Sequence, residues 1–275
     1  MERIVNAIKR YAPEGIEFVD TDEEADLAII YAYAHRRKVG WRTERLTAAG
    51  KKYAIVQTAI RSTRNPNTED WMYIWKDAEL VWSYYNLKQL AINDIQPKMK
   101  DPRHMWLSRK VDFNFYYAPL GVDPEVFKEV RDDRTYSIIF GENRDECSTQ
   151  IIEATMRAGY AGFMLGSGIS DQELVKKYSR SKFVSGLRRK EGFELPVIEG
   201  LLCGAIPIVF DRPETRHWFE DLAVFISEES SEELVKSLEY ILRDSFNIDW
   251  KHKKRIVKER FNWETIIKGF WERIL

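Results

Sequence analysis

The sequence of 275 residues lacks several features that would assign it to a particular class of protein. It has two cysteines, Cys147 and Cys203, without a CxxC pair or a histidine at metal-ligand spacing, so we expect free core thiols and no metal site. No apolar run reaches the length of a membrane span. Charges run through the first residues, MERIVNAIKRY, which is not the pattern of a signal peptide. We therefore expect a cytoplasmic protein without a transmembrane segment.

The chain also lacks the strong positive net charge that would indicate a nucleic-acid-binding protein, because its formal charge is -1. Hydrophobic residues make up 44% and charged residues 32%, which is an ordinary globular balance. The length suits two domains, each with a sizeable core.

Apolar runs alternate with segments of helical spacing along both halves of the chain. This alternation predicts an α/β fold with two doubly wound parallel sheets and a boundary near residues 122–134. Polar, turn-rich stretches at 61–70 and 93–102 are expected to be loops. The expected strands are 26–33, 53–59, 79–84 and 115–119 in the first half, and 136–141, 162–165, 182–187, 205–210 and 223–227 in the second.

The stretch EGFELPVIEGLLCGAIPIVF, residues 191–210, combines two carboxylates with a helix start. Pro196 suits the first turn of a helix, and Gly204 suits the position just after its end. Glu191 would then lie in the preceding loop, and Glu199 in the first turn. Free N–H groups at such a helix start can hold a polar, partly anionic ligand.

Four ordered segments resemble retaining GT-B glycosyltransferases of the glycosyl transferases group 1 family. EGFELPVIE resembles the E-x7-E motif of that family, and PLGVDPEVF (119–127) resembles the segment that ends its first domain. SDQELVKKY (170–178) and FNWE (261–264) resemble two further family segments. The resemblance covers residues 115–275 well and residues 1–110 in outline.

The resemblance implies a GT-B fold, in which two Rossmann-like domains face a central cleft. It implies an acceptor-side domain at 1–125, a nucleotide-sugar-binding domain at 126–255, and a C-terminal helix at 256–275 that crosses back to the first domain. The activity would be transfer of a hexose or pentose from a UDP- or GDP-sugar to an acceptor hydroxyl, with retention. No metal and no cofactor other than the nucleotide-sugar co-substrate are expected.

The resemblance also implies roles for individual residues. Glu199 would accept hydrogen bonds from the ribose hydroxyls, and Glu191 would contact the donor sugar as a catalytic residue. The loop at the helix start would bind the sugar and the diphosphate, with Arg144 as the first candidate for the diphosphate and Arg188 or Arg189 as alternatives. Donor-binding positions by this reasoning are Gly166, Ser167, Gly192, Phe193, Glu194 and Leu195. Phe193 is equally consistent with a core position.

The sequence departs from the family pattern at four places. Glu194 stands where the family has glycine, and Arg144 only approximates the usual Arg and Lys pair. The first half lacks the family's Gly-Gly loop. It has Gln57 and Thr58 where the family has a histidine, and His35 is therefore a second catalytic candidate.

Basic residues follow the expected strands of the first half, with tryptophans nearby in sequence. We expect Arg36, Arg37 and Arg61 to bind the acceptor. Cations interleaved with aromatics suit a phosphate-rich or base-stacking partner, and a solvated helix face has the same composition. Three hypotheses stand: a glycosyltransferase acting on a sugar, lipid-linked or small acceptor, a phage-type enzyme that glycosylates a hydroxymethylated DNA base, and a non-catalytic nucleotide-sugar-binding protein.

Overall fold

A computed structural model of the chain describes residues 2–32, 36–58, 68–95, 112–130, 133–141, 147–188 and 193–275. The chain divides into two compact units, Met1–Pro119 with Trp263–Leu275, and Leu120–Asn262. The division falls a few residues before the expected boundary at 125. The expected C-terminal helix over 256–275 is in fact two helices, α10 (Trp250–Arg260) in the second unit and α11 (Trp263–Trp271) in the first.

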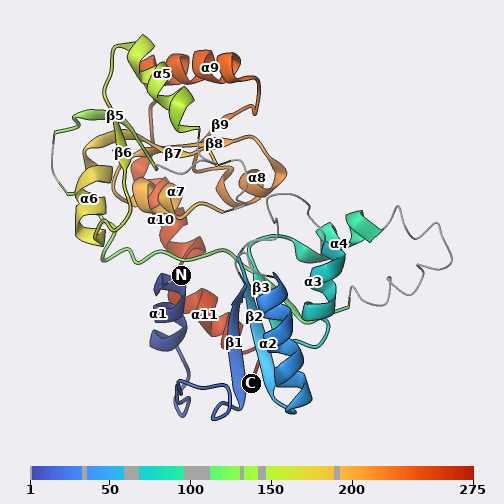
Figure 1. The fold of residues 1–275 in the computed structure, drawn as a ribbon. Helices are drawn as coiled ribbons and strands as arrows, with labels where there is room; N and C mark the ends of the chain where they lie inside the picture. Colours follow the sequence, from blue (N-terminus) through green and yellow to red (C-terminus); the bar gives the residue numbers. More distant parts are fainter. Residues whose placement is uncertain are drawn as a thin grey trace. The chain divides into compact units, whose positions relative to one another are not determined.

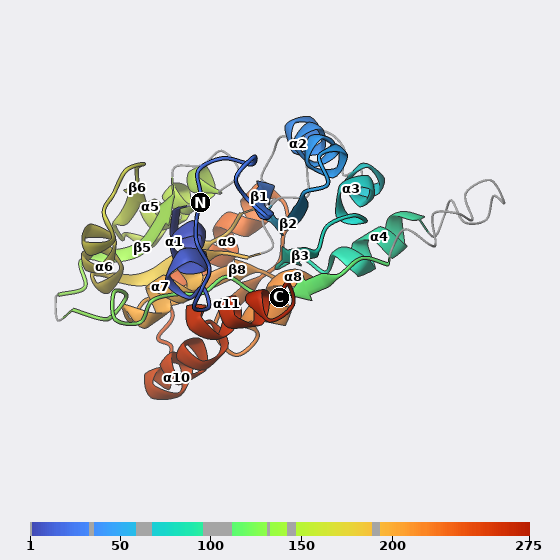
Figure 2. The same ribbon diagram turned by 90° about the horizontal axis from the view of Figure 1, so that it is seen from below.

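The first unit contains a parallel sheet whose strands lie in the order of the chain. The strands are β1 (Leu27–Ala32), β2 (Lys52–Gln57), β3 (Leu80–Ser83) and β4 (Phe115–Tyr117). Each connection moves in the same direction, so right-handed crossovers place the intervening helices on one face. Figures 1 and 2 show α2 (Arg36–Ala48), α3 (Thr68–Trp75) and α4 (Leu87–Ile95) on that face, and α1 (Glu2–Arg10) and α11 on the other.

Aromatic residues fill the core on both faces of this sheet. Trp75 is fully buried on the α2–α4 side, where its indole N–H donates to Gln57 Oε1 at 3.1 Å. On the opposite side the Trp82 ring packs against Trp263 and Phe270 of α11. Large buried aromatic surfaces of this kind contribute much of the free energy that holds helices to a sheet.

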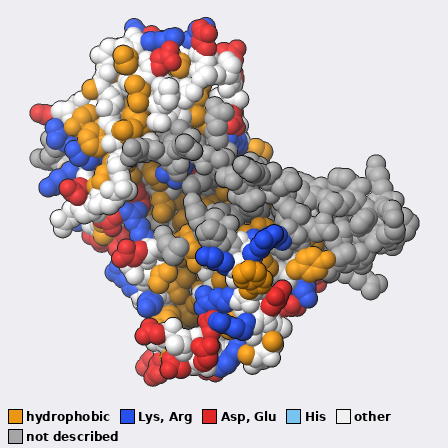
Figure 3. All heavy atoms as spheres, viewed as in Figure 1, with side chains coloured by type: hydrophobic (Ala, Val, Ile, Leu, Met, Phe, Trp, Pro, Cys, Tyr) orange, Lys and Arg blue, Asp and Glu red, His pale blue; other side chains and the backbone are white. Residues whose placement is uncertain are grey.

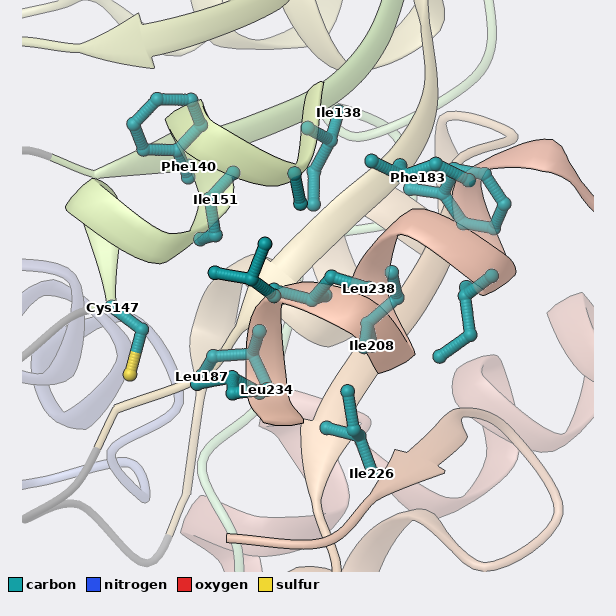
Figure 4. Packing of buried hydrophobic residues seen from close by; sticks show 14 of the residues in the cluster. Ile138, Phe140, Cys147, Ile151, Phe183, Leu187, Ile208, Ile226, Leu234 and Leu238 are labelled. Carbon is teal, nitrogen blue, oxygen red and sulfur yellow. The ribbon is translucent and has the colours of Figure 1, made fainter. Parts of the chain in front are cut away.

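The second unit contains five parallel strands in a different order. The sheet runs β6-β5-β7-β8-β9 and contains β5 (Tyr136–Gly141), β6 (Gly162–Leu165), β7 (Ser181–Gly186), β8 (Ile206–Phe210) and β9 (Val224–Ile226). Its helices are α5 (Ser148–Ala158), α6 (Asp171–Ser179), α7 (Leu195–Leu202), α8 (Pro213–Phe219), α9 (Ser231–Arg243) and α10. Figure 4 shows part of the core, in which Ile151 of α5 and Leu234 and Leu238 of α9 lie over strand residues such as Ile138 and Ile208.

Several local signals in the sequence are realised in this unit. Ser170 and Ser230 form capping boxes with Glu173 and Glu233 at the starts of α6 and α9. Gly204 follows the end of α7 with φ +89°, a conformation that favours glycine. All nine expected strands are present within a few residues of their predicted bounds.

Four helices depart from the expectation. The helices α3 and α4 extend into segments expected to be loops, α8 had been given no structure, and only the end of α10 lies within the expected C-terminal helix. In α3 the residues from Trp71 to Trp75 are nearly all apolar, so they carry no helical period, and four of them are buried in the core. Within the described ranges, no helix is long and apolar enough to cross a membrane. The cytoplasmic location stays a prediction.

The segment before β1 is tied to α2 by an ion pair. The Arg42 guanidinium donates to both carboxylate oxygens of Asp22, at 2.9 Å from Nε and 2.5 Å from Nη2, and Asp22 is largely buried. These hydrogen bonds from Arg42 hold the pKa of the Asp22 carboxyl below its ordinary value of 3.8. The carboxylate therefore stabilises the fold above that pH and loses its contribution as the pH falls through the lowered value.

We expect Asp22→Asn to reduce the free energy of unfolding by about 1–2 kcal/mol at neutral pH, because two charge-assisted hydrogen bonds are weakened. Urea denaturation at pH 7 and at about pH 3 would measure the effect, which should shrink at the lower pH. Asp221→Asn is the control, since its 4.0 Å contact with Arg260 is exposed and should contribute little. An equal loss at both pH values would contradict the assignment.

Candidate functional site

The second sheet changes direction at β5. From β5 the chain goes to β6 on one side and then crosses to β7 on the other, so β5 has a sequence neighbour on each side. The helices that follow two such strands leave on opposite faces, which opens a crevice beyond the carboxyl ends of the strands. Ligands of doubly wound proteins bind at such switch points.

A pocket of about 430 Å³ lies at this switch point. Its volume falls within the range of small-molecule sites. The walls come from the ends of β5, β6 and β7, from the loop after β6, and from the first turns of α6 and α7. The lining residues are Ile139, Phe140, Gly141, Leu165, Gly166, Ser167, Gly168, Ile169, Leu174, Val184, Ser185, Arg188 and Pro196. Gly166, Ser167 and Arg188 were expected at the donor site, Gly168 was expected near the nucleotide beside them, and Pro196 was expected at the start of the adjoining helix.

Two glycines allow α7 to lie close to β7. A Cβ at Gly200 would lie 2.6 Å from Val184 Cγ1, and one at Gly186 would lie 2.6 Å from Val197 Cγ2. The helix can approach the strand this closely only because neither position carries a side chain. The close approach sets the start of α7 at the pocket wall, where Pro196 lines the cavity.

Glu194 precedes α7 as its N-cap residue and is 2% exposed. Its Oε2 lies 3.6 Å from Nε of Arg188, whose side chain is 24% exposed and lines the pocket. The start of α7 and the guanidinium both carry positive charge next to this side chain. This pair is the main departure from the family pattern that the described part of the site contains, since the family has glycine at the position of Glu194.

Glu199 lies in the second turn of α7, and not in the first as expected. It is buried, and its Oε2 accepts a hydrogen bond from the Tyr178 hydroxyl of α6 at 3.4 Å. Leu174 of α6 and Pro196 of α7 line the pocket. Tyr178 follows Leu174 by one helical turn, and Glu199 follows Pro196 by one turn. Each residue of the Tyr178–Glu199 pair is therefore one helical turn from the pocket lining.

The remaining described donor-site candidates contribute in different ways. The Phe193 side chain is in the core, with its ring against Trp218, Phe219 and Phe261. Only its backbone is available for a ligand. Leu195 opens α7. The positions of Arg144, Glu191, Gly192, His35 and Arg61 lie outside the described residues, as does Arg189.

In the first unit, Gln57, which stands where the resembled family has a histidine, has a structural role. Gln57 is fully buried, and its side-chain amide joins Trp75 of α3 to the carbonyl of Ala32 in β1. Arg36 and Arg37, expected to bind the acceptor, form the first turn of α2 after β1. Arg37 is exposed and Arg36 is half-buried.

The pocket-lining residues that sequence reasoning missed are mostly apolar or lie within strands.

Cys203 is buried four residues after Glu199, at the end of α7, and this burial affects its thiol. It raises the pKa of the Cys203 thiol to about 12, and the charge of Glu199 adds to the effect. Both cysteines are free and buried, as expected.

Comparison with solved structures identifies the fold. The chain is similar to sucrose-phosphate synthase from Thermosynechococcus elongatus, with a TM-score of 0.67, 14% identity, and coverage of 90% of this chain and 72% of that chain. It is also similar to HepE of Anabaena in complex with UDP and glucose, with a TM-score of 0.64, 14% identity, and coverage of 98% and 80%. A third similar structure is the pneumococcal O-GlcNAc transferase GtfA in complex with UDP and GlcNAc, with a TM-score of 0.58, 13% identity, and coverage of 82% and 53%.

In the sequence comparisons, no protein-family model and no curated protein sequence matches the chain. The structural likeness establishes the GT-B fold, as the sequence motifs predicted.

We expect Arg188→Ala to lower the free energy of unfolding by about 1–3 kcal/mol, because it removes a cation from beside a buried carboxylate. Adding Glu194→Gln should recover most of that loss, since no buried charge is then left without its ion-pair partner. Urea denaturation of the single and double variants measures both effects. Arg216→Ala is the control, because its partner Asp211 is exposed and the change should have little effect on the free energy of unfolding. Additive losses from the two changes would contradict the coupling.

Proposed function

We propose that this protein is a glycosyltransferase that transfers a sugar from a nucleoside-diphosphate sugar to an acceptor hydroxyl. The observation that carries the proposal is the pocket at the β5 switch point, which has a largely apolar wall, a glycine-containing loop, a helix start and an arginine. An apolar wall suits a nucleobase, and the helix start with the arginine suits phosphates. The expected cleft between the two units stays part of this proposal.

The solved structures support a nucleotide-sugar donor. HepE was crystallised with UDP-glucose and with UDP and glucose, and GtfA with UDP and GlcNAc. We therefore favour a UDP-sugar over a GDP-sugar as the donor, and a hexose as the sugar.

The proposed chemistry exchanges one bond at the anomeric carbon for another. The bond from that carbon to the diphosphate oxygen breaks, a bond to the acceptor oxygen forms, and the acceptor hydroxyl releases its proton. The nucleoside diphosphate leaves with the bonding electrons. Arg188 and the start of α7 stabilise that growing negative charge, which is commonly the largest catalytic contribution. Arg144 is a second candidate for this role.

We assign the remaining positions as the family resemblance implies. Glu191 contacts the donor sugar, with His35 as an alternative catalytic residue. Backbone N–H groups from Gly192 to Leu195 bind the sugar and the diphosphate, and Gly166 and Ser167 contact the nucleotide. Retention of the anomeric configuration follows from the same resemblance, and NMR of the product would test it.

Glu199 is the proposed acceptor of hydrogen bonds from the ribose hydroxyls. Its place one turn behind Pro196, on the same side of α7, supports this role. We expect Glu199→Gln to weaken UDP binding about tenfold, because charge-assisted hydrogen bonds to the ribose are lost. Binding of 2′,3′-dideoxy-UDP should change little, because it has no ribose hydroxyls to donate. Isothermal titration with both nucleotides measures the difference.

Tyr178→Phe is the matched control for that variant. It removes the hydroxyl that contacts Glu199 and leaves the carboxylate in place, so UDP should still bind more tightly than its dideoxy analogue. Equal affinity of Glu199→Gln and the unchanged protein for UDP would exclude the ribose role. Failure of every nucleoside diphosphate and nucleotide-sugar to raise the melting temperature would overturn the donor site itself.

We propose that transfer requires no metal, because cationic side chains and a helix start are available to neutralise the diphosphate. The expected result is unchanged donor hydrolysis in the presence of EDTA. Loss of hydrolysis in EDTA and its recovery on adding magnesium would contradict this part of the proposal. Binding of a nucleotide-sugar without any turnover would instead favour a non-catalytic nucleotide-sugar-binding protein.

A further inference from the structure

Trp41 of α2 is exposed to an unusual degree. Its exposed fraction is 67%, whereas the other described tryptophans are buried or half-buried. A large apolar ring left in water gives up the free energy that burial would provide. The apolar side of α2 is already occupied, because Val39 and Leu46 pack into the core beneath the helix. Trp41 is therefore not needed to hold α2 to the sheet.

Charged side chains share the side of α2 that carries this ring. Helical spacing puts Arg37, Lys38 and Arg45 on that side, together with the acidic Glu44, at offsets of three or four residues from Trp41. All three cations are exposed, and Arg45 also contacts Asp22 at 3.3 Å. The helix has one acidic residue, Glu44, against five basic ones: Arg36, Arg37, Lys38, Arg42 and Arg45. Three of these cations occupy the first turn, where the helix dipole disfavours positive charge.

A second exposed aromatic lies on the neighbouring helix. Tyr73 of α3 is about half exposed. The two helices approach closely at Gly40 and Ile74, which are the chain neighbours of Trp41 and Tyr73, and a Cβ at Gly40 would lie 3.8 Å from Ile74 Cδ1. Figure 3 shows Lys and Arg side chains beside hydrophobic ones, with some acidic ones among them, over α2 and α3. We call Arg37, Lys38, Trp41 and Arg45 the α2 surface.

We propose that the α2 surface binds single-stranded nucleic acid, with a base stacked on Trp41 and phosphates on Arg37, Lys38 and Arg45. Stacking on an exposed aromatic, combined with cations that follow the backbone, is the usual way in which single strands are bound. A bilayer is the less favoured partner. Helices that lie in a membrane interface present a broad apolar face, and the exposed side of α2 offers one aromatic ring among charged residues.

Binding of nucleic acid at the α2 surface would also identify the class of acceptor. If the protein transfers sugar as proposed above, the α2 surface holds a nucleic acid that carries the acceptor hydroxyl. This second step rests on the proposed function, and the binding itself does not. Enzymes that modify a base act on single strands or on a base turned out of the duplex, which agrees with a stacking surface.

Fluorescence anisotropy with a labelled 20-nucleotide single strand of mixed sequence tests the binding. We expect Trp41→Ala to weaken binding fivefold or more, since stacking on one aromatic has about that value, and Trp41→Phe to retain most of it. Three phosphate contacts predict that affinity falls roughly tenfold to twentyfold between 50 and 200 mM salt. Arg37→Ala with Lys38→Ala should reduce that salt dependence.

Tyr240→Ala is the matched control for Trp41. Tyr240 is an aromatic 72% exposed on α9, with Lys236 and Arg243 at offsets of four and three residues. Lys251→Ala with Lys258→Ala removes two exposed cations of α10 and serves as the control for charge. Both controls should bind the strand as the unchanged protein does.

Each outcome decides the proposal. Selective loss in Trp41→Ala supports it. Absence of binding at 50 mM salt, equal weakening by Tyr240→Ala, or capture by phosphatidylserine vesicles without binding to the strand would overturn it. Melting-temperature shifts with UDP, recorded on the same samples, separate the two proposals. A UDP shift without strand binding rejects only the α2 surface, and strand binding without any nucleotide shift rejects the sugar transfer.

Discussion

The place of β5 between β6 and β7 is the constraint on which the candidate site depends. Parallel strands need crossover connections, and right-handed crossovers to opposite sides must leave the sheet on opposite faces. The space at the carboxyl end of β5 therefore cannot be filled by either connecting helix. Gly141, Gly166 and Arg188 reach the same pocket because three neighbouring strands end there. The order of the strands thus determines where the site lies, whichever side chains line it.

The glycine contacts between α7 and β7 connect this topology to the chemistry. Gly186 and Gly200 let the helix lie against the strand, and the first turn of α7 then forms one wall of the pocket. The same closeness buries Glu194 and Glu199, two carboxylates on an otherwise apolar segment. Each carboxylate has a partner from a different element, Arg188 after β7 and Tyr178 of α6. Burial of a carboxylate is costly unless it is paired, so both of these contacts depend on the close packing of α7.

The sequence predicted the strands and the helices with clear signals, because those signals are local. Pro196 in the first turn of α7 and the glycine at 204 just after its end act within a few residues. The α3 helix was missed because Trp71, Met72, Ile74 and Trp75 are all buried and the exposed residue among them, Tyr73, is aromatic too, so that the segment shows no polar–apolar period. Leu174 and Ser185 read as ordinary core positions, and only the order of the strands, which no local pattern contains, brings them to the pocket beside Arg188. The burial of Glu199 likewise depends on a contact between two helices.

The described strands of the first sheet follow one another in chain order, so there is no switch point among them. Polar groups near the carboxyl ends of β2 and β3 bond to one another, since Trp75 donates to Gln57 and the hydroxyls of Ser83 and Tyr84 donate to the carbonyls of Gln57 and Thr58. Polar groups that are satisfied in this way gain little from a ligand. We propose that a partner of the first unit is recognised at the exposed side of α2, where Trp41 lies among charged residues that can bind a strand of bases and phosphates.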